Sequence, residues 1–346
     1  MVEAVDTLTE RQRVILEYVV EDYLAGGQPV GSKALTSRRG MEVSASTVRY
    51  ELAELEERGF LTHPHTSAGR VPTDLGYRFY VDRLLETLEP RPAELPIDLS
   101  QARNEIDAAL RATTDALAQV THLLALVTAP PLESTVVRHV EVLLLQPQVV
   151  VVVVITSTGG VTKRVIVFDD PVDPGLVDWA GEYLNERVSG LSLGARMLRG
   201  RFEDPELTPR ERAFLQALQP AFTELVQANE QSIFVGGAAG VMEELRKEEW
   251  SVFRGVLEAL ERRAALLDFI RSMLDAKRPF VRVGSEFEDP AFAGVSLVGA
   301  PYGLSHRNLG TVNLLGPTRM DYGRALSAVR GAALQLSRFV EELYEE

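Results

Sequence analysis

Basic and hydroxyl side chains gather in the first part of a chain that is otherwise strongly acidic. Residues 28–50 carry four basic residues and one acidic residue, a net charge of +3, whereas the whole chain of 346 residues has a net charge of −14. Ser46, Thr47, Arg49 and Tyr50 lie within five consecutive positions. Their hydroxyl and guanidinium groups can donate hydrogen bonds to phosphates and base edges. This chemistry indicates a surface that faces DNA.

A helix-turn-helix is predicted to hold these side chains. A first helix is expected over residues 10–26, because its apolar residues recur at helical spacing until two glycines end it. A short second helix is expected over Ser32–Arg39, and a third begins after Ser44, a favourable N-cap residue, and ends at Gly59. Two short helices joined by a brief turn are typical of a helix-turn-helix.

The third helix is polarised along its length. Val48, Leu52 and Leu55 repeat at the spacing of a buried stripe, so the opposite side presents the hydroxyl and basic residues in its first turns. Glu54 and Glu57 follow in the later turns. Only the N-terminal half is therefore suited to enter a groove lined by phosphates. Protein–protein contact through these helices is the alternative.

A hairpin of the kind called a wing is predicted directly after the third helix. Residues 60–63 and 70–73 flank the turn 66–69, and Thr73 then caps a fourth helix. Side chains beside the wing tip can reach an adjacent groove or the DNA backbone. The predicted DNA-binding residues are the phosphate contacts Lys33 and Arg38, the major-groove contacts Ser46, Thr47, Arg49 and Tyr50, and the wing residues His65, Thr66 and Arg70.

The rest of the chain is predicted to mix helices and strands. Three prolines within residues 86–98 indicate a linker. Residues 106–127 show a heptad pattern, which favours a long helix packed on its own domain, with a helix–helix dimer seam as the alternative. Strand signals occur at 140–145, 149–155, 161–168, 280–283, 295–300 and 311–315, a helical stretch at 174–276, and a final helix at 322–343. One sheet interrupted by a helical block predicts an α+β fold with one domain inserted into another.

Several classes of function are disfavoured. The chain has no Cys, which removes disulfides, thiolate nucleophiles and Cys-type zinc sites and makes the cytoplasm the expected location. The longest apolar run, Val149–Ile155, is far shorter than the roughly 20 residues of a membrane span, so no membrane role is expected. His63 and His65 lack a third metal ligand nearby, and residues 236–240 lack the Lys of a phosphate loop. No catalytic set stands out, so no enzyme, cofactor or metal site is expected.

The run Val149–Ile155 suggests a heat-sensitive element. Seven consecutive β-branched residues without charge or proline are typical of a segment that pairs with other chains when it is exposed. We expect a covered strand in the native protein, with Thr156 at a solvent-facing edge. A charge at Val152 would then destabilise the fold, whereas a charge at Thr156 would reduce aggregation on heating.

Several motifs resemble those of the HrcA family of bacterial heat-shock repressors. They are Pro29–Lys33, Val43–Arg49, Glu51–Glu56, His65–Arg78 and the C-terminal run Gly316–Tyr322. From its residues alone, this C-terminal run can be interpreted as a structural turn or as an anion site. The resemblance extends over essentially the whole chain. The family usually has Asn where this chain has Tyr50, and a phenol cannot make the bidentate contact that an amide makes with adenine.

The resemblance implies a three-part protomer. Its parts are a winged helix at 1–85, a GAF-like domain at 99–172 and 277–346, and a mainly helical dimerisation domain inserted at 173–276, and a linker at 86–98 follows the winged helix. It further implies a homodimer that represses chaperone operons from an inverted-repeat operator, with activity that depends on temperature and on a GroEL-type chaperonin. A repressor gated by a small metabolite in the GAF-like domain is the alternative.

Overall fold

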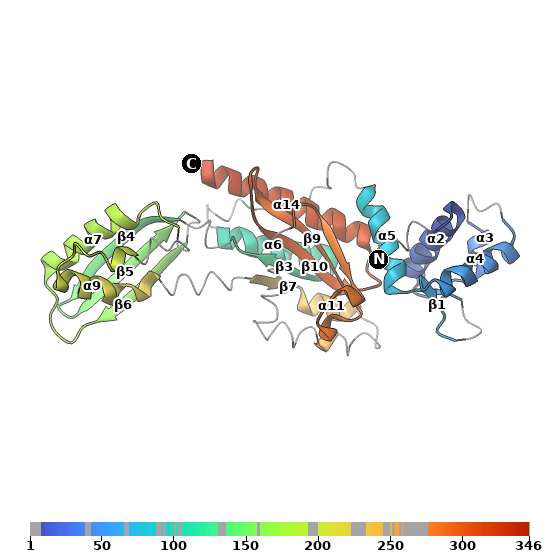
Figure 1. The fold of residues 1–346 in the computed structure, drawn as a ribbon, viewed down its shortest axis with the longest axis horizontal. Helices are drawn as coiled ribbons and strands as arrows, with labels where there is room; N and C mark the ends of the chain where they lie inside the picture. The colour runs from blue at the N-terminus through green and yellow to red at the C-terminus, as the bar shows by residue number, and fades with distance from the viewer. Residues whose placement is uncertain are drawn as a thin grey trace.

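Three groups of helices and strands lie in a row along the molecule (Figure 1). The N-terminal helices are at one end, a five-stranded sheet is in the middle, and a three-stranded sheet is at the other end. This computed structural model describes residues 8–38, 43–65, 69–87, 92, 95–97, 99, 102, 106–130, 136–157, 160–192, 200–222, 233–244, 250, 253–255, 258 and 276–345. The predicted α+β fold class is confirmed.

The N-terminal helices begin and end at the residues that the sequence indicates. α2 (Glu10–Gly26) begins at Thr9, which forms a capping box with Gln12, and ends at Gly27, whose φ of 62° suits a glycine. α4 (Ala45–Glu57) begins at Ser44, whose hydroxyl accepts a hydrogen bond from the Thr47 amide at 3.2 Å. The predicted first and third helices are therefore confirmed.

The wing and the helix after it are also confirmed. β1 (Leu61–Thr62) and β2 (Val71–Pro72) pair antiparallel, and the Thr73 hydroxyl caps α5 (Asp74–Glu86). α3 (Ser32–Thr36) is shorter than predicted, because the Thr36 and Ser37 hydroxyls donate to the Lys33 carbonyl and close its last turn.

The central sheet is antiparallel throughout, with the strand order β7-β3-β10-β9-β8. Its strands are β3 (Leu124–Thr128), β7 (Ile233–Gly236), β8 (Phe280–Val283), β9 (Val295–Leu304) and β10 (Arg307–Pro317). α6 (Ile106–Thr121) and α14 (Tyr322–Glu345) cover one face, and α11 (Ala238–Glu244) lies on the other. In the turn before α14, the Asp321 carboxylate accepts a hydrogen bond from the Arg324 amide at 2.9 Å, which supports the structural interpretation of this turn.

Two predictions for this sheet are wrong. The long helix expected to reach residue 127 ends at Thr121, where His122 adopts a φ of 55°, and Leu124–Thr128 form the fully buried strand β3. Leu124 and Val127 fit a heptad only because a short apolar run is compatible with the period of a helix as well as with that of a strand. β7 lies inside the predicted helical stretch, and a four-residue strand is too short for a periodic signal.

The three-stranded sheet is separate from the central sheet, so the single sheet predicted from the sequence is wrong. It consists of β4 (Val137–Gln146), β5 (Val149–Thr156) and β6 (Val161–Val167), which pair only with their neighbours in sequence. α7 (Pro174–Val188) and α9 (Pro209–Leu218) cover one of its faces and close a second hydrophobic core. Hairpin pairing between consecutive strands needs no long loop closure, which explains why these strands group by themselves.

The two faces of this sheet differ in burial. Val150, Val152 and Val154 point into the core under the helices and are buried. The opposite face, here called the outer face, includes Leu143, Leu145, Val149, Val151, Val153, Ile155, Val165 and Val167, several of which are exposed. Thr156 is only 4% exposed and its hydroxyl donates to the Gly160 carbonyl. The prediction that Thr156 lies at a solvent-facing edge is therefore wrong.

Candidate nucleic-acid interface

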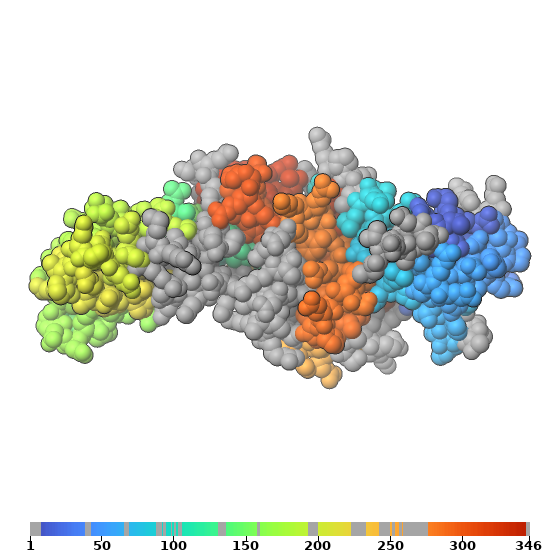
Figure 2. Space-filling model, in the orientation of Figure 1, coloured from blue at the N-terminus to red at the C-terminus, as the bar shows by residue number. Residues whose placement is uncertain are grey.

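The α4 helix presents its polar side at the free end of the molecule. Val48, Leu52 and Leu55 are buried and anchor the helix, whereas Arg49 and Tyr50 on the other side are exposed. Figure 2 shows the blue surface that contains α3 and α4 at one end of the protein. The helix therefore has the burial pattern of a recognition helix, with its first turns available to a groove.

Hydroxyl groups cluster at the start of α4. The Ser44 oxygen lies 2.7 Å from the Ser46 hydroxyl and 3.0 Å from the Thr47 hydroxyl. These contacts hold three hydroxyls beside the helix N-terminus, where free amide donors and the helix dipole favour an approaching phosphate. Ser46 is exposed, while Thr47 is half-buried. Ser46 is thus better placed than Thr47 to contact DNA.

Tyr50 is the largest exposed side chain on α4, with 64% of its surface accessible. A hydrogen bond to the Glu54 carboxylate raises the pKa of its phenol above the ordinary value, so Tyr50 stays protonated and remains a donor. The ring stands free of the core, and its hydroxyl is directed towards an acid one turn along the helix. A base contact by this hydroxyl has to compete with Glu54.

The predicted cationic contacts fall into two groups. Lys33 and Arg49 are exposed, and neither has an ion-pair partner among the described residues. Arg38 instead forms ion pairs with Glu21 at 2.5 Å and with Asp22 at 2.8 Å. Its guanidinium also lies 4.5 Å from the centre of the Tyr18 ring. Arg38 therefore fastens the end of α3 to α2, which the sequence prediction did not foresee.

The wing is attached to α4 through one acidic residue. The Glu56 carboxylate accepts a bond from Arg70 at 2.7 Å and also contacts the His63 ring, so it holds both strands of the wing. The backbone of Arg70 pairs with that of Val30 in both directions. His65 is exposed beside the tip, and Thr66 lies outside the described residues. Arg70 thus positions the wing from its base.

Two acids of the interface escaped the sequence reasoning. Glu56 was not singled out although it follows the buried stripe of α4 and faces the hairpin. Glu51 is buried, and its carboxylate lies 3.4 Å from the Arg11 guanidinium of α2. The signal for Glu51 was its place beside Val48 and Leu52 on the helical wheel, because a carboxylate on a buried stripe needs a partner.

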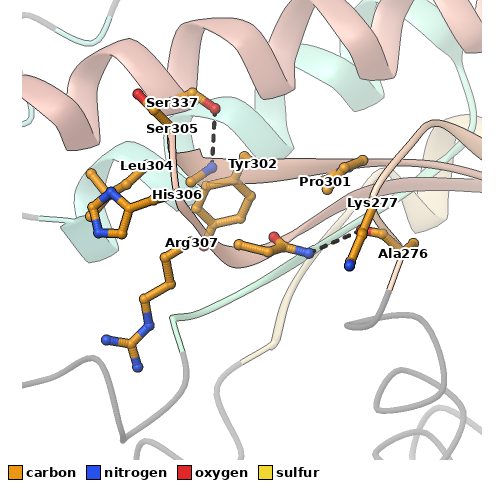
Figure 3. Close-up of a pocket in the computed structure, with 11 residues that line it drawn as sticks. Ala276, Lys277, Pro301, Tyr302, Leu304, Ser305, His306, Arg307 and Ser337 are labelled. Atoms are coloured by element: carbon orange, nitrogen blue, oxygen red, sulfur yellow. Dashed lines mark hydrogen bonds between the residues drawn. The ribbon is translucent and has the colours of Figure 1, made fainter.

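A small cavity lies at the opposite end of the central sheet from the winged helix. It has a volume of about 380 Å³ and is lined by the β9–β10 turn, Lys277 and Ser337 (Figure 3). Two of its polar side chains are bonded within the protein: Ser337 accepts from the Gly303 amide and Asn308 donates to the Ala276 carbonyl. Within the described part of the chain, no three His, Asp or Glu side chains lie close enough to hold a metal ion. No described helix is long and apolar enough to cross a membrane.

A winged helix with an exposed, polar recognition helix defines a DNA-binding regulator. Residues 107–326 match the family described as "HrcA protein C terminal domain", and residues 15–79 match the "Ribonuclease R winged-helix domain". The chain belongs to the HrcA family, whose curated relatives are named heat-inducible transcription repressors.

The similarity covers nearly the whole chain. The heat-inducible transcription repressor HrcA of Parafrankia sp. (strain EAN1pec) is 36% identical, over 97% of this chain and 98% of its own length. The repressor of the same name from Nocardioides sp. (strain ATCC BAA-499 / JS614) is 37% identical, over 96% and 99%. A crystal structure described as a hypothetical protein at 2.2 Å resolution shares the fold, with a TM-score of 0.62 and 22% identity over 98% of this chain and 99% of that chain. The predicted family and the prediction of a regulator rather than an enzyme are confirmed.

Proposed function

We propose that this protein is a heat-inducible transcription repressor that binds an inverted-repeat operator of chaperone operons as a homodimer. The observation that carries the proposal is the exposed, polar first half of α4, placed at the free end of a winged helix. A helix of this kind enters the major groove with its N-terminal residues on base edges. Because its target is bacterial operator DNA, the repressor acts in the cytoplasm.

Each predicted DNA-binding residue has a role in this proposal. Arg49 contacts a base, with Ser46 and Thr47 beside it at the start of the helix. Tyr50 donates at most one hydrogen bond, in competition with Glu54. Lys33 binds a phosphate, and the wing residues His65, Thr66 and Arg70 set the second contact with the duplex. The ion pairs of Arg38 leave its predicted phosphate contact with less support.

The outer face of the three-stranded sheet supports a homodimer. It is a broad apolar surface in which Val167 is 73% exposed, and such a surface on a folded protein marks an interaction site. Glu141 and Lys163 flank Val153 at opposite edges of one rung. A two-fold axis parallel to β5 lays β4 of one protomer over β6 of the other, so each Glu141 meets Lys163 of the second copy. The face is thus self-complementary in charge as well as apolar.

The division into domains follows from the separation of β4–β6 from the central sheet. We propose that the inserted dimerisation domain begins before β4 rather than at residue 173, because β4–β6 share a core with α7 and α9. The winged helix at 1–85 and a GAF-like domain built on the central sheet complete the protomer. The linker predicted at 86–98 lies mostly outside the described residues.

The response to heat and the GroEL-type chaperonin are proposed from membership in the family. The outer face offers a physical route, because dissociation of the dimer exposes apolar strands that aggregate or that a chaperonin binds. A chaperonin occupied by heat-damaged proteins then leaves the repressor inactive.

Footprinting of the purified protein on chaperone promoters of its own genome tests the proposal. One protected inverted repeat, absent from unrelated promoters, is the expected result. Absence of protection on every such promoter contradicts the proposal. Gating by a small metabolite is the second candidate, and a thermal-shift screen tests it, because a ligand raises stability by RT ln(1 + [L]/Kd).

A further inference from the structure

Helix α5 is bonded to the end of the recognition helix. The Thr73 hydroxyl donates to the Gly59 carbonyl at 2.6 Å, and the Thr73 amide donates to the Phe60 carbonyl at 3.1 Å. Gly76 packs so closely on the Phe60 carbonyl that a Cβ there would overlap it. Gly59 and Phe60 directly follow the C-cap of α4. The start of α5 and the end of α4 therefore move as one body.

The same helix is bonded to the central sheet. The Asp74 carboxylate accepts a hydrogen bond from the Ser285 amide at 2.8 Å. Arg78 donates to the Val281 carbonyl at 2.7 Å and lies 3.3 Å from the Glu286 carboxylate. Glu286 also accepts from the Val283 amide at 2.9 Å. We call Asp74, Arg78 and Glu286 the α5 clamp.

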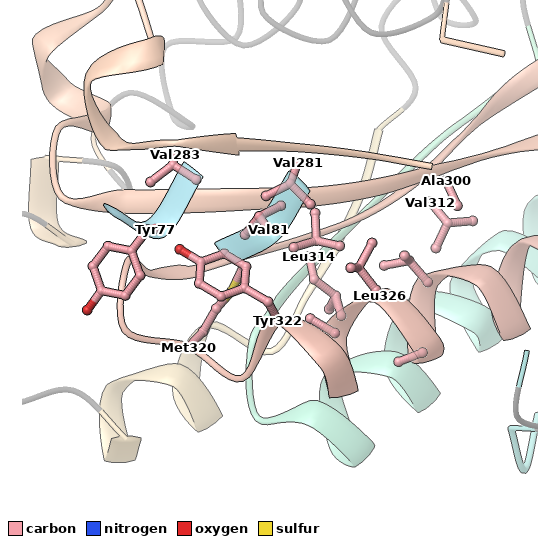
Figure 4. Close-up of a cluster of buried hydrophobic side chains, with 14 of the residues drawn as sticks. Tyr77, Val81, Val281, Val283, Ala300, Val312, Leu314, Met320, Tyr322 and Leu326 are labelled. Atoms are coloured by element: carbon pink, nitrogen blue, oxygen red, sulfur yellow. The ribbon is translucent and has the colours of Figure 1, made fainter. Parts of the chain in front are cut away.

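The clamp lies in a closely packed interface. Arg78 is only 15% exposed although it carries a charge. A Cβ at Gly284, whose φ is 42°, would overlap the Asp74 carboxylate. Figure 4 shows Tyr77 and Val81 of α5 against Val281 of β8 and Tyr322 of α14, and the rings of Tyr77 and Tyr322 are 6.0 Å apart. Buried hydrogen bonds in such a setting give the helix one orientation on the sheet.

We propose that the α5 clamp positions the recognition helix and thereby determines which half-site spacing the dimer accepts. The inference rests on the proposed function. In a two-fold dimer, the distance between the two recognition helices and their relative direction depend on every rigid contact between each helix and the axis. The clamp provides such a contact between α4 and the central sheet. Asp74, Arg78 and Glu286 act through α4 and do not touch DNA.

The spacing of the operator is a sensitive readout of this contact. One added base pair moves a half-site by about 3.4 Å and rotates it by about 34° around the duplex. A rigid dimer loses base contacts on such a site, whereas a dimer with loosened winged helices can adjust. Loss of the clamp is therefore expected to change the preference among spacings.

The experiment uses the full-length protein and operators whose spacers are one or two base pairs longer or shorter than the natural one. The wild type is expected to bind the altered operators at least about tenfold more weakly, as for a site with misplaced base contacts. In Arg78→Ala and Gly284→Ala the affinity for the natural operator is expected to fall. The ratio of the affinity for the natural operator to that for the altered operators is expected to shrink to about threefold or less. Arg78→Lys keeps one donor and is expected to give an intermediate ratio.

Arg83→Ala is the matched control on the same helix. Arg83 pairs with Glu17 of α2 at 2.7 Å, so this ion pair lies within the winged helix and does not reach the sheet. Arg83→Ala should keep the wild-type ratio of affinities for the natural and the altered operators. The proposal is overturned if Arg78→Ala and Gly284→Ala, shown to be folded by circular dichroism, both keep that ratio. If Arg78→Ala does not fold, Gly284→Ala and Glu286→Gln decide. A wild type that binds no inverted repeat instead overturns the proposed function itself.

Discussion

The guanidinium of Arg70 lies 2.7 Å from the carboxylate of Glu56, so the second strand of the wing is tied to the last turns of the recognition helix. Both side chains are mostly buried. The wing and α4 therefore form one surface, in which Glu56 fixes the angle of the wing.

If Arg70 acts through Glu56, the two residues are energetically coupled. Arg70→Ala is expected to weaken operator binding in the wild-type background, because the wing loses its attachment. In a Glu56→Gln background the same change should have little further effect. Fluorescence anisotropy on labelled operator gives the dissociation constants of the wild type, the two single variants and the double variant. An equal loss in both backgrounds would show that Arg70 binds DNA independently of Glu56.

Arg49→Ala is expected to remove discrimination between operator and random DNA while the protein stays folded. Arg49 is exposed on α4, and a good base contact provides about 1–3 kcal/mol of discrimination. Competition binding with operator and random duplexes measures the ratio. Arg210→Ala, an exposed arginine of α9, is the control and should leave it unchanged. A ratio that Arg49→Ala leaves unchanged contradicts the assignment.

Lys33 and Arg38 are expected to respond differently to removal. Lys33→Ala should weaken operator and random DNA alike and lower the slope of log K against log salt by about one phosphate equivalent. Arg38→Ala should lower the free energy of unfolding by up to about 1 kcal/mol through its ion pairs and leave that slope nearly unchanged. Binding titrations over a range of salt concentrations, with thermal unfolding of both variants, make the comparison. A smaller slope of log K against log salt in Arg38→Ala would instead support the phosphate contact predicted for Arg38.

Val165→Glu on the outer face is expected to produce monomers. It places a carboxylate within the proposed apolar interface, where it loses hydration without a partner. Analytical ultracentrifugation measures the oligomeric state. The control is Leu334→Glu on α14, because Leu334 is 41% exposed and Val165 is 48% exposed. A Val165→Glu protein that stays dimeric would place the interface elsewhere.

The orientation of the dimer has a separate test in its charges. Glu141→Lys and Lys163→Glu are each expected to weaken the dimer, because each sets like charges against each other across the two-fold axis. The double variant should recover the wild-type dimer affinity. Sedimentation equilibrium gives the three dissociation constants. Additive losses in the double variant exclude an axis parallel to β5.

Thr156→Lys is now expected to destabilise the protein, as Val152→Lys does, because both positions are buried. A buried ammonium without a partner costs several kcal/mol. The melting temperature should fall in both variants, and light scattering during heating should begin earlier. Glu182→Lys on the exposed side of α7 is the control. An unchanged melting temperature in Thr156→Lys would contradict its burial.

Local signals predicted the N-terminal elements well. Ser44 and Thr73 cap helices because a hydroxyl before an apolar repeat has a short-range use, and the wing follows from two short segments around one turn. The strand β7 and the split into two sheets were missed. β7 pairs with residues distant in sequence, such as Phe234 with Val127, which no local pattern contains. The split arises because β4–β6 pair only with one another, whereas β3 pairs with the distant strand β10.

The candidate site was predicted in its exposed residues and missed in its supports. Arg49 and Tyr50 are exposed as the helical wheel of α4 indicates. The partners of Arg38 lie on another helix. Arg78 pairs with Asp82 on its own helix and with Glu286, which is more than 200 positions away in sequence. A charge pattern along one segment therefore shows which cations are available in that segment but not which are neutralised by the fold.

The three-stranded sheet with its helices is inserted at a single rung of the central sheet. Thr128 at the end of β3 is paired with Ile233 at the start of β7, so residues 129–232 leave the sheet and return to it at adjacent positions. In polymer terms the insertion is a closed loop, and the entropy of closing a loop grows only with the logarithm of its length. The central sheet is therefore almost indifferent to how long this segment is or how stably it folds. The inserted segment can lengthen, shorten or melt at its own temperature without a change in the register of the strands that carry it.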